Sequence, residues 1–382
     1  MPARPTIADV ARAAGVSKGA ASHALNGRPG VSDATRARVR DAATALGWFP
    51  NGIARALSGS RADALGWAIV RTPKSPTIDP YFTELFSGIE LALAATPLSL
   101  VAKLVTEREE EDELYAHWAA ERRVDGVLLS DVDAPDWRFD RLNELGLPFA
   151  AFHSRLNVQP GVSGEPAPSG GAHAPSVWLP ELPTVSGLLD HVLEHGHRRI
   201  GWISGDPLKA AVLVRERATL LWAREHEASV VTVFTDYSPA AGANAAVELL
   251  RSDTPPTCLV FDSDIMALAG VSACHALGLR VPDDISIASF IDSPLCEVAM
   301  PPITALKHPI VEFGQQLTLR LLDLLGNHAH AGDSARAYAR PALPMSEDTF
   351  DSNGDRVLPV PTLTVRQSVG PAANGVASTR RH

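Results

Sequence analysis

Two stretches of the chain hold residue types that could perform catalysis or bind a metal. The run Gly15-Val16-Ser17-Lys18-Gly19 has the Gly-x-Ser-x-Gly spacing that exposes a serine nucleophile in many hydrolases. That chemistry needs a strand before the serine, whereas a helical pattern precedes Ser17, which is better placed to cap the next helix. His191, His195 and His197 are close in sequence, but no carboxylate or cysteine is evidently placed to complete a metal site. The chain also lacks the phosphate-loop spacing Gly-x-x-x-x-Gly-Lys-Ser/Thr, so no catalytic or metal centre is predicted.

The residues around this serine instead predict two short helices joined by a tight turn. Apolar residues recur with helical spacing over 7–14, a second helical run covers 17–25, and a third follows. Small residues, Ala11 and Ala21, stand where the first two helices would cross, and Gly15 permits the turn between them. This pattern fits a helix-turn-helix, which projects the first side chains of its second helix into the major groove of DNA.

The charge of the chain is divided unevenly. The first 61 residues hold nine Lys or Arg against three Asp or Glu, while the remainder holds 25 against 41, within a net charge of −10. A basic N-terminal segment on an acidic body suggests that the segment meets phosphate and the body does not.

The length and composition set the broad class. At 382 residues the chain is too long for one ordinary core, so two or three domains are expected. No run of eighteen apolar residues predicts a membrane span and no apolar segment predicts a secretory signal, so a cytoplasmic protein is expected. The cysteines Cys258, Cys274 and Cys296 are scattered and odd in number, which fits a reducing compartment and predicts no disulfide framework.

From residue 65 onward, apolar strand-like runs alternate with amphipathic helical runs, as at 258–261 and 265–277. This alternation predicts parallel sheets covered by helices, and roughly ten strands exceed one open sheet, so we expect two α/β lobes. The stretches 157–175 and 345–361 are expected to be surface excursions, and the tail after residue 371 is expected to be disordered.

A longer pattern runs through the N-terminal segment. Its residues are Thr6-Ile7-Ala8-Asp9-Val10-Ala11, Gly15-Val16-Ser17, Ser22, Leu25-Asn26-Gly27, Val31-Ser32, Thr35-Arg36, Val39, Ala42, Leu46-Gly47-Trp48, Pro50-Asn51, Ala54-Arg55 and Leu57. In order and without gaps, this pattern resembles the head of the LacI/GalR family of repressors. The resemblance implies a sequence-specific transcriptional regulator, in most cases a repressor, whose operator binding is modulated by a small-molecule effector.

The resemblance also implies roles along this head (1–49) and the hinge and linker behind it (50–62). Lys18, Gly19 and His23 occupy positions that face base edges from the second helix. Positions that touch phosphates, or cap helices near them, hold Thr6, Ser17, Ser22, Asn26, Ser32, Thr35 and Arg36. The hinge helix, which orders on operator DNA, would include Asn51, Ala54, Arg55 and Leu57. Leu57 would wedge into the minor groove, and the alternative is a linker leucine packed on its own lobe.

Two departures from the family bear on the operator. The family commonly has Thr-Val-Ser-Arg where this chain has Ala20-Ala21-Ser22-His23, so a bidentate reader of guanine is lost. Gly19 offers no side chain. The operator sequence therefore cannot be transferred from relatives.

The rest of the chain resembles the sensing core of the same family more loosely. The matches are Asp79-Pro80-Tyr81-Phe82, Gly88-Ile89-Glu90, Val124-Asp125-Gly126-Val127-Leu128-Leu129, His195-Gly196-His197-Arg198-Arg199-Ile200, residues 277–286, Pro301-Pro302-Ile303-Thr304 and Leu363-Thr364-Val365-Arg366. The implied fold is two α/β lobes of periplasmic-binding-protein type over residues 63–370, with a ligand cleft between them. One lobe is expected at about 63–156 and 291–320 and the other at about 176–290 and 321–366, with the disordered tail at 371–382.

By the same resemblance, six residues would line the cleft: Tyr81, Phe82, Arg155, Arg215, Ser263 and Asp264. The alternative is that the two aromatic residues are core and Arg215 is a surface charge. Several usual cleft groups are missing, since Ser263 replaces an asparagine, Ile291 an aspartate, and Pro180-Glu181 an Asp-Asn pair. A sugar binder needs paired groups for vicinal hydroxyls, so we expect an effector other than a typical hexose, or weak or absent binding.

Two other functional classes stay open at this point. A free-standing solute-binding protein is compatible with the body alone, although the basic head argues against it, and an enzyme on a two-lobed scaffold has no catalytic constellation behind it. No cofactor or metal is expected. The expected partners are double-stranded operator DNA, a small effector such as a sugar derivative in an atypical pocket, and a second copy in a homodimer, at the nucleoid and away from membranes. Effector identity, target genes, inducer against corepressor, repressor against activator, and dimer against tetramer are undetermined by the sequence.

Overall fold

A computed structural model of the chain describes residues 5–25, 30–48, 61–71, 80–94, 96–156, 175–327, 349–351 and 354–372. The chain forms two compact units, an N-terminal head and an α/β core that begins at Ala64. Within these ranges, no helix has the length and apolar character needed to cross a membrane.

Three short helices build the head: α1 (Ile7–Ala14), α2 (Lys18–Leu25) and α3 (Asp33–Ala45). Small and β-branched side chains form its core, namely Val10, Ala11, Ala14, Ala21, Ala24, Val39 and Ala43. Gly15 ends α1 in the left-handed region at φ 65°, where a glycine is favoured. The Ser17 hydroxyl caps α2 by accepting a hydrogen bond from the Ala20 amide at 3.1 Å. The helix-turn-helix predicted from the sequence is therefore confirmed.

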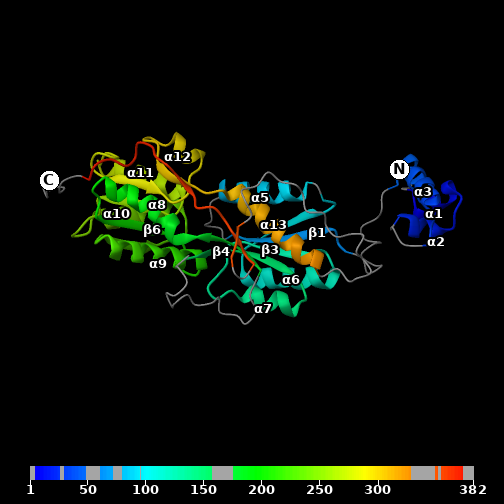
Figure 1. Cartoon of the computed structure of the whole chain (residues 1–382). Coiled ribbons are helices and arrows are strands. Elements are labelled where there is room, and N and C mark those ends of the chain that lie inside the picture. Colours follow the sequence, from blue (N-terminus) through cyan, green and yellow to red (C-terminus); the bar gives the residue numbers. More distant parts are fainter. Residues whose placement is uncertain are drawn as a thin grey trace. The chain divides into compact units, whose positions relative to one another are not determined.

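The first lobe of the core is a seven-stranded sheet of order β11-β12-β5-β4-β3-β1-β2. Its strands are β1 (Ala64–Val70), β2 (Ser99–Val105), β3 (Gly126–Leu129), β4 (Phe149–Arg155), β5 (Ser176–Pro180), β11 (Thr349–Phe350) and β12 (Arg356–Val357). All neighbours are parallel except β11 and β12. Figure 1 shows α5 (Pro80–Leu93) and α13 (Ile310–Asn327) on one face of this sheet and α6 (Arg108–Glu121) and α7 (Trp137–Glu144) on the other.

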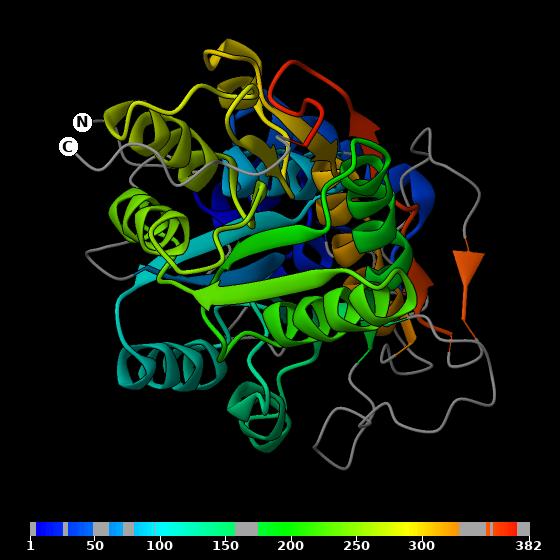
Figure 2. The ribbon, with the colours of Figure 1, turned by 90° about the vertical axis from the view of Figure 1, so that its left-hand side faces the viewer.

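The second lobe is a six-stranded sheet of order β13-β10-β9-β8-β6-β7, parallel except between β10 and β13. Its strands are β6 (Arg199–Ser204), β7 (Ser229–Phe234), β8 (Cys258–Phe261), β9 (Ser286–Ser289), β10 (Thr304–Lys307) and β13 (Thr362–Thr364). Its helices are α8 (Glu181–Glu194), α9 (Ala210–Glu225), α10 (Pro239–Leu250), α11 (Asp264–Ala276) and α12 (Pro294–Val298). One buried cluster joins α8 and α9 to the sheet and another joins α10 and α11, so helices cover both faces (Figure 2).

The lobe boundaries differ from those expected from the sequence, because the chain passes between the sheets three times. Strand β5 pairs with β4 of the first lobe, although 176–290 was expected in the second. Strand β10 pairs with β9 of the second lobe, although 291–320 was expected in the first. The segment 321–366 was expected in the second lobe, but the end of α13 packs on the first sheet and β12 pairs with β5 of that sheet. Strand β13, in the same segment, pairs with β10 of the second sheet.

The structure also differs from the prediction at two stretches that were expected to be irregular. The described part of 345–361 contains β11 and β12 rather than only a loop, and Ala372 in the expected tail donates its amide to the His195 carbonyl at 2.8 Å. Residues 157–174 and 373–382 lie outside the described residues.

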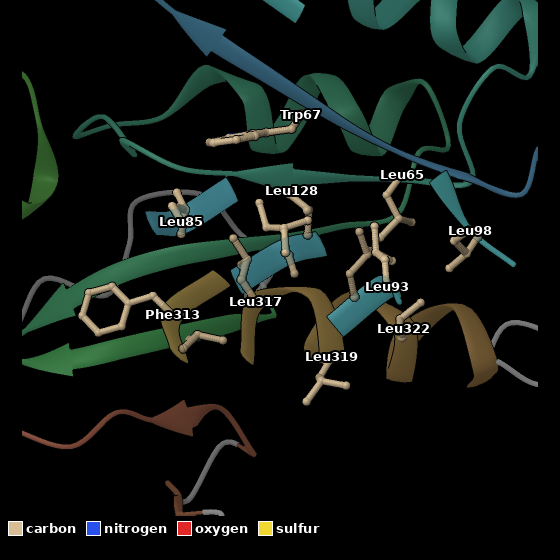
Figure 3. Packing of buried hydrophobic residues seen from close by; sticks show 14 of the residues in the cluster. Leu65, Trp67, Leu85, Leu93, Leu98, Leu128, Phe313, Leu317, Leu319 and Leu322 are labelled. Atoms are coloured by element: carbon tan, nitrogen blue, oxygen red, sulfur yellow. The ribbon is translucent and has the colours of Figure 1, made fainter. Parts of the chain in front are cut away.

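The contact between α5 and α13 fixes the first lobe. A Cβ on Gly88 would overlap the carbonyl of Val311, and a Cβ on Gly314 would overlap the carbonyl of Leu85, so glycine allows the two backbones to meet. Figure 3 shows Leu85 and Leu93 of α5 gathered with Leu317 of α13 beside the strands. This packing fixes the position of α5 on its face of the sheet.

Candidate functional site

One face of α2 is exposed on the head. Lys18, Gly19 and His23 are exposed, whereas Ala21 and Ala24 on the opposite side of the helix are buried. The three residues expected to face base edges are thus together on one surface. Lysine and histidine can donate hydrogen bonds to base edges, and Gly19 allows close approach.

Residues expected near phosphates stabilise the first turns of α1 and α3 through hydrogen bonds. Thr6 donates both its amide (2.9 Å) and its hydroxyl (2.7 Å) to the Asp9 carboxylate, and these bonds lower the pKa of Asp9. Ser32 accepts a hydrogen bond from the Thr35 amide at 3.3 Å, and the two hydroxyls are 3.0 Å apart. Ordered helix N-termini attract phosphate through their amides and dipoles.

The other residues of the expected DNA interface divide into two groups. Ser22 and Arg36 are half-buried in the head. Asn26, Asn51, Ala54, Arg55 and Leu57 lie outside the described residues.

A cavity of about 330 Å³ lies between the two lobes of the core, where the carboxyl ends of the parallel strands of both sheets converge. Five of the six expected cleft residues line it: Tyr81, Phe82, Arg215, Ser263 and Asp264. Its size is near the lower end of the usual range for small-molecule sites, roughly 300–1,000 Å³.

Arg155 is the expected cleft residue that does not line the cavity. Its guanidinium binds Asp351 at 2.7 Å, Asp355 at 2.8 Å and the Ser176 hydroxyl at 3.0 Å. These partners come from β5 and from the segment around β12, so Arg155 holds late parts of the chain against the first sheet. The carboxylates of Asp351 and Asp355 therefore compensate the charge of Arg155, which does not face the cavity.

Arg215 lines the cavity from α9, but two buried carboxylates hold it. Its Nε donates to Glu181 at 2.7 Å and its Nη1 lies 2.9 Å from Asp262. The guanidinium also lies 4.0 Å from the centre of the Phe290 ring. The two carboxylates raise the pKa of Arg215, although burial opposes this, so the residue stays a cation fixed within the protein.

The expected aromatic pair lies at the start of α5. Phe82 stacks on Trp67 with ring centres 6.1 Å apart, and the Arg71 guanidinium lies 3.6 Å from the Phe82 ring centre. Tyr81 meets Phe82 edge to face at 5.1 Å. Both rings are half-buried and pack against the first core, so they combine a packing role with a place in the cavity wall.

Asp262 is a central residue of the site that was not predicted from the sequence. Its carboxylate accepts hydrogen bonds from Trp202 Nε1 (2.8 Å), the Ser204 hydroxyl (2.7 Å) and the Gly205 amide (3.0 Å), besides its contact with Arg215. A lone aspartate directly after the apolar run Cys258–Phe261 was the available signal, because ligand sites collect at strand carboxyl ends.

Two further unpredicted residues complete the wall. Tyr237 is half-buried beside Arg215, and a Cβ on Gly205 would overlap its ring, so the glycine makes room for it. Burial, with Arg215 nearby, lowers the pKa of His308 to about 3, so this imidazole is neutral at physiological pH.

The segments after β3 and β6 bridge the two lobes beside the cavity. Ala134 donates its amide to the Leu208 carbonyl at 3.0 Å, and Ala210 donates to the Val132 carbonyl at 2.8 Å. The Lys209 ammonium lies 2.7 Å from the Asp133 carboxylate. These contacts connect the two lobes on this side of the cavity.

The catalytic and metal motifs weighed from the sequence have structural roles. Ser17 caps α2 after a helix rather than following a strand. His195 bonds the His191 carbonyl at 2.8 Å, and the ring of His197 lies 2.9 Å from both Thr257 Oγ1 and the Gly370 carbonyl. No group of three or more candidate metal ligands occurs in the described part of the chain.

Comparison with known proteins agrees with this architecture. Residues 6–51 match the bacterial regulatory proteins of the lacI family, and residues 189–369 match the periplasmic binding protein-like domain. The HTH-type transcriptional regulator CelR of Thermobifida fusca is 30% identical over 328 residues, which cover 84% of this chain and 92% of CelR.

Two solved structures share the fold. The lac repressor dimer bound to operator and an anti-inducer superposes with a TM-score of 0.74 at 21% identity, covering 96% of this chain and all of that one. The CelR–cellobiose complex superposes with a TM-score of 0.66 at 24% identity, covering 96% of this chain and all of that one. With its helix-turn-helix head, its two-lobed core and the extent of its match to CelR, the chain belongs to the LacI family of bacterial transcriptional regulators.

Proposed function

We propose that the protein is a repressor that binds a roughly palindromic operator as a homodimer. A small molecule that enters the cleft lowers or raises its affinity for the operator. The observation that carries the proposal is the exposed face of α2, with Lys18 and Gly19 in the first turn and His23 in the last turn of a capped recognition helix. A single small head makes few specific contacts, so two symmetric heads are needed for useful affinity.

Other parts of the chain supply the rest of this function. The hinge at 50–62 would place paired helices in the central minor groove, with Leu57 as the wedge. Exposed apolar side chains of the core, Val298 and Met300, at 75% and 81% exposure, are candidates for coverage by a second copy. A DNA-binding role places the protein at the nucleoid in the cytoplasm, and no catalytic activity is assigned to it.

The cavity between the lobes is the proposed effector site. A ligand that favours one relative position of the lobes biases the hinge pair, because two sites coupled to one equilibrium affect each other reciprocally. A solute-binding protein without a transcriptional role is not favoured, because the head is a complete helix-turn-helix of the lacI family.

Selection of bound sequences from a random duplex pool tests the proposal, with purified full-length protein at near-physiological salt. Enrichment of a palindrome supports it. Lys18→Ala and His23→Ala should relax the selected sequence at single positions, whereas Arg38→Ala, a change at an exposed position of α3, should not. Leu57→Ala should weaken specific binding more than non-specific binding. Salt-sensitive binding without any enriched sequence would refute the repressor function.

A further inference from the structure

A carboxylate in the cavity wall has one oxygen without a partner. Asp264, the first residue of α11, is 6% exposed and lines the cavity. Its Oδ1 accepts a hydrogen bond from the Ile265 amide at 2.7 Å, whereas its Oδ2 is buried and has no hydrogen-bond partner among the described residues. A buried charged oxygen left unsatisfied is costly, so a donor from a bound molecule is the expected complement.

The basic side chains of the cavity wall already contact other groups of the protein. Five aspartates and three basic residues line the cavity. Of the basic residues, Arg215 lies between Glu181 and Asp262, and Lys209 pairs with Asp133. The third, Arg71, lies over the ring of Phe82. The excess of carboxylates makes the cavity attractive to cations and unfavourable to anions.

A second buried carboxylate explains why Arg215 is not available to a ligand. Glu181 is fully buried and does not line the cavity, and its Oε1 accepts a hydrogen bond from Arg215 Nε at 2.7 Å. Glu181 therefore compensates the charge of Arg215, and Asp264 is the carboxylate of the described cavity wall that keeps a buried oxygen without a partner.

The remaining wall is largely apolar. Phe82, Phe152, Ile291 and Phe313 all line the cavity, and Ile291 follows the end of β9. An apolar wall opposes a ring that carries a hydroxyl on every carbon, because hydroxyls buried without partners are costly. The wall instead suits a ligand whose main part is apolar or aromatic.

We propose that the effector is a small organic cation, an amine on an apolar or aromatic body, whose ammonium group binds Asp264. This inference rests on the proposed role of the cleft as the effector site. An ammonium supplies both the hydrogen bond and the opposite charge that the Asp264 carboxylate lacks, whereas a sugar hydroxyl supplies only the hydrogen bond.

Titration calorimetry on the full-length protein tests the proposal with probes matched in shape. The pairs are 2-phenylethylamine with 2-phenylethanol and glucosamine with glucose, and cellobiose is a neutral reference. The aromatic amine should bind at least about tenfold more tightly than its alcohol, because a charge-assisted hydrogen bond is worth about a factor of ten or more.

Two variants locate the cation. Asp264→Asn keeps the shape and should remove most of the preference for the amine. Asp206→Asn removes the same charge from the same cavity at a residue whose Oδ1 is already bonded to the Leu208 amide, and should reduce amine affinity less than about fivefold. The wild-type comparison within each pair stands even if a variant folds poorly.

Binding of an alcohol, of glucose or of cellobiose as tight as that of 2-phenylethylamine would overturn the proposal, and so would a failure of 2-phenylethylamine to bind. Amine binding that Asp264→Asn leaves unchanged would overturn it as well. Operator binding by the same preparation is measured in parallel, both without ligand and with each probe. Failure of the amines with operator binding intact removes only this inference, whereas failure of operator binding removes the proposed function.

Discussion

Replacing Arg215 with methionine should destabilise the core more than any single change at its surface. The substitution keeps the apolar stem and leaves Glu181 and Asp262, which are 0% and 1% exposed, without their shared cation. Breaking a buried ion pair by removing one partner costs about 3–5 kcal/mol. At roughly 2 °C per kcal/mol for a domain of this size, the midpoint of thermal unfolding should fall by about 6–10 °C.

The expected pH dependence follows from Glu181. Burial raises the pKa of this carboxyl even with the arginine present. Without the arginine the pKa rises further, so the carboxyl takes up a proton as the pH falls and the uncompensated charge disappears. The loss of stability should therefore be smaller at pH 5 than at pH 8.

Differential scanning calorimetry on the full-length protein measures this effect, with Arg215→Met combined with Glu181→Met as the control. The double variant removes a charge of each sign and leaves Asp262 with its bonds to Trp202, Ser204 and Gly205. It should recover more than half of the lost stability. A decrease below 2 °C for Arg215→Met, or a double variant less stable than the single one, would refute the role given to this network.

Three further outcomes are expected. Because His308 is neutral when folded, with a pKa of about 3, its contribution to stability is complete above pH 6.5 and is lost toward pH 3. His308→Gln should flatten the unfolding free energy between pH 4 and 6 by up to about 1.4 kcal/mol per pH unit, measured by urea titration, and an unchanged slope would contradict this. Gly88→Ala should lower the free energy of unfolding by about 2 kcal/mol or more, because the added methyl meets the Val311 backbone. Gly187→Ala, in open space on α8, should be neutral or stabilising. Equal thermal midpoints for the two variants would count against the packing described. The three cysteine thiols are buried, which raises their pKa, to about 11 for Cys274 and about 12 for Cys296, so a thiol reagent at pH 8 should label them only after denaturation.

The local features of the fold could be predicted from the sequence, and the long-range pairings could not. Gly15 and Ser17 act within one turn of chain, so their types alone predict the helix boundaries of the head. Strand β5 has no local signal for its lobe, because its partner β4 ends before residue 157 and the pairing depends on how the chain crosses between sheets. Periodicity predicts an element and not its neighbour.

The candidate site shows the same division. Tyr81 and Phe82 were found by resemblance at the start of α5 and line the cavity. Arg155 was placed there as well, but its partners Asp351 and Asp355 come from almost 200 residues later, and no local pattern connects them. Asp262 was missed because an aspartate after a strand is common, and its importance depends on the four donors that surround it.

The ratio of affinities for a selected palindrome and for a scrambled duplex, at one fixed salt concentration, tests the central claim most directly. A head that reads base edges from α2 should bind the palindrome at least about 1,000-fold more tightly. Binding that follows salt concentration with a ratio near one would show that the head contacts only the phosphate backbone, and would contradict the account.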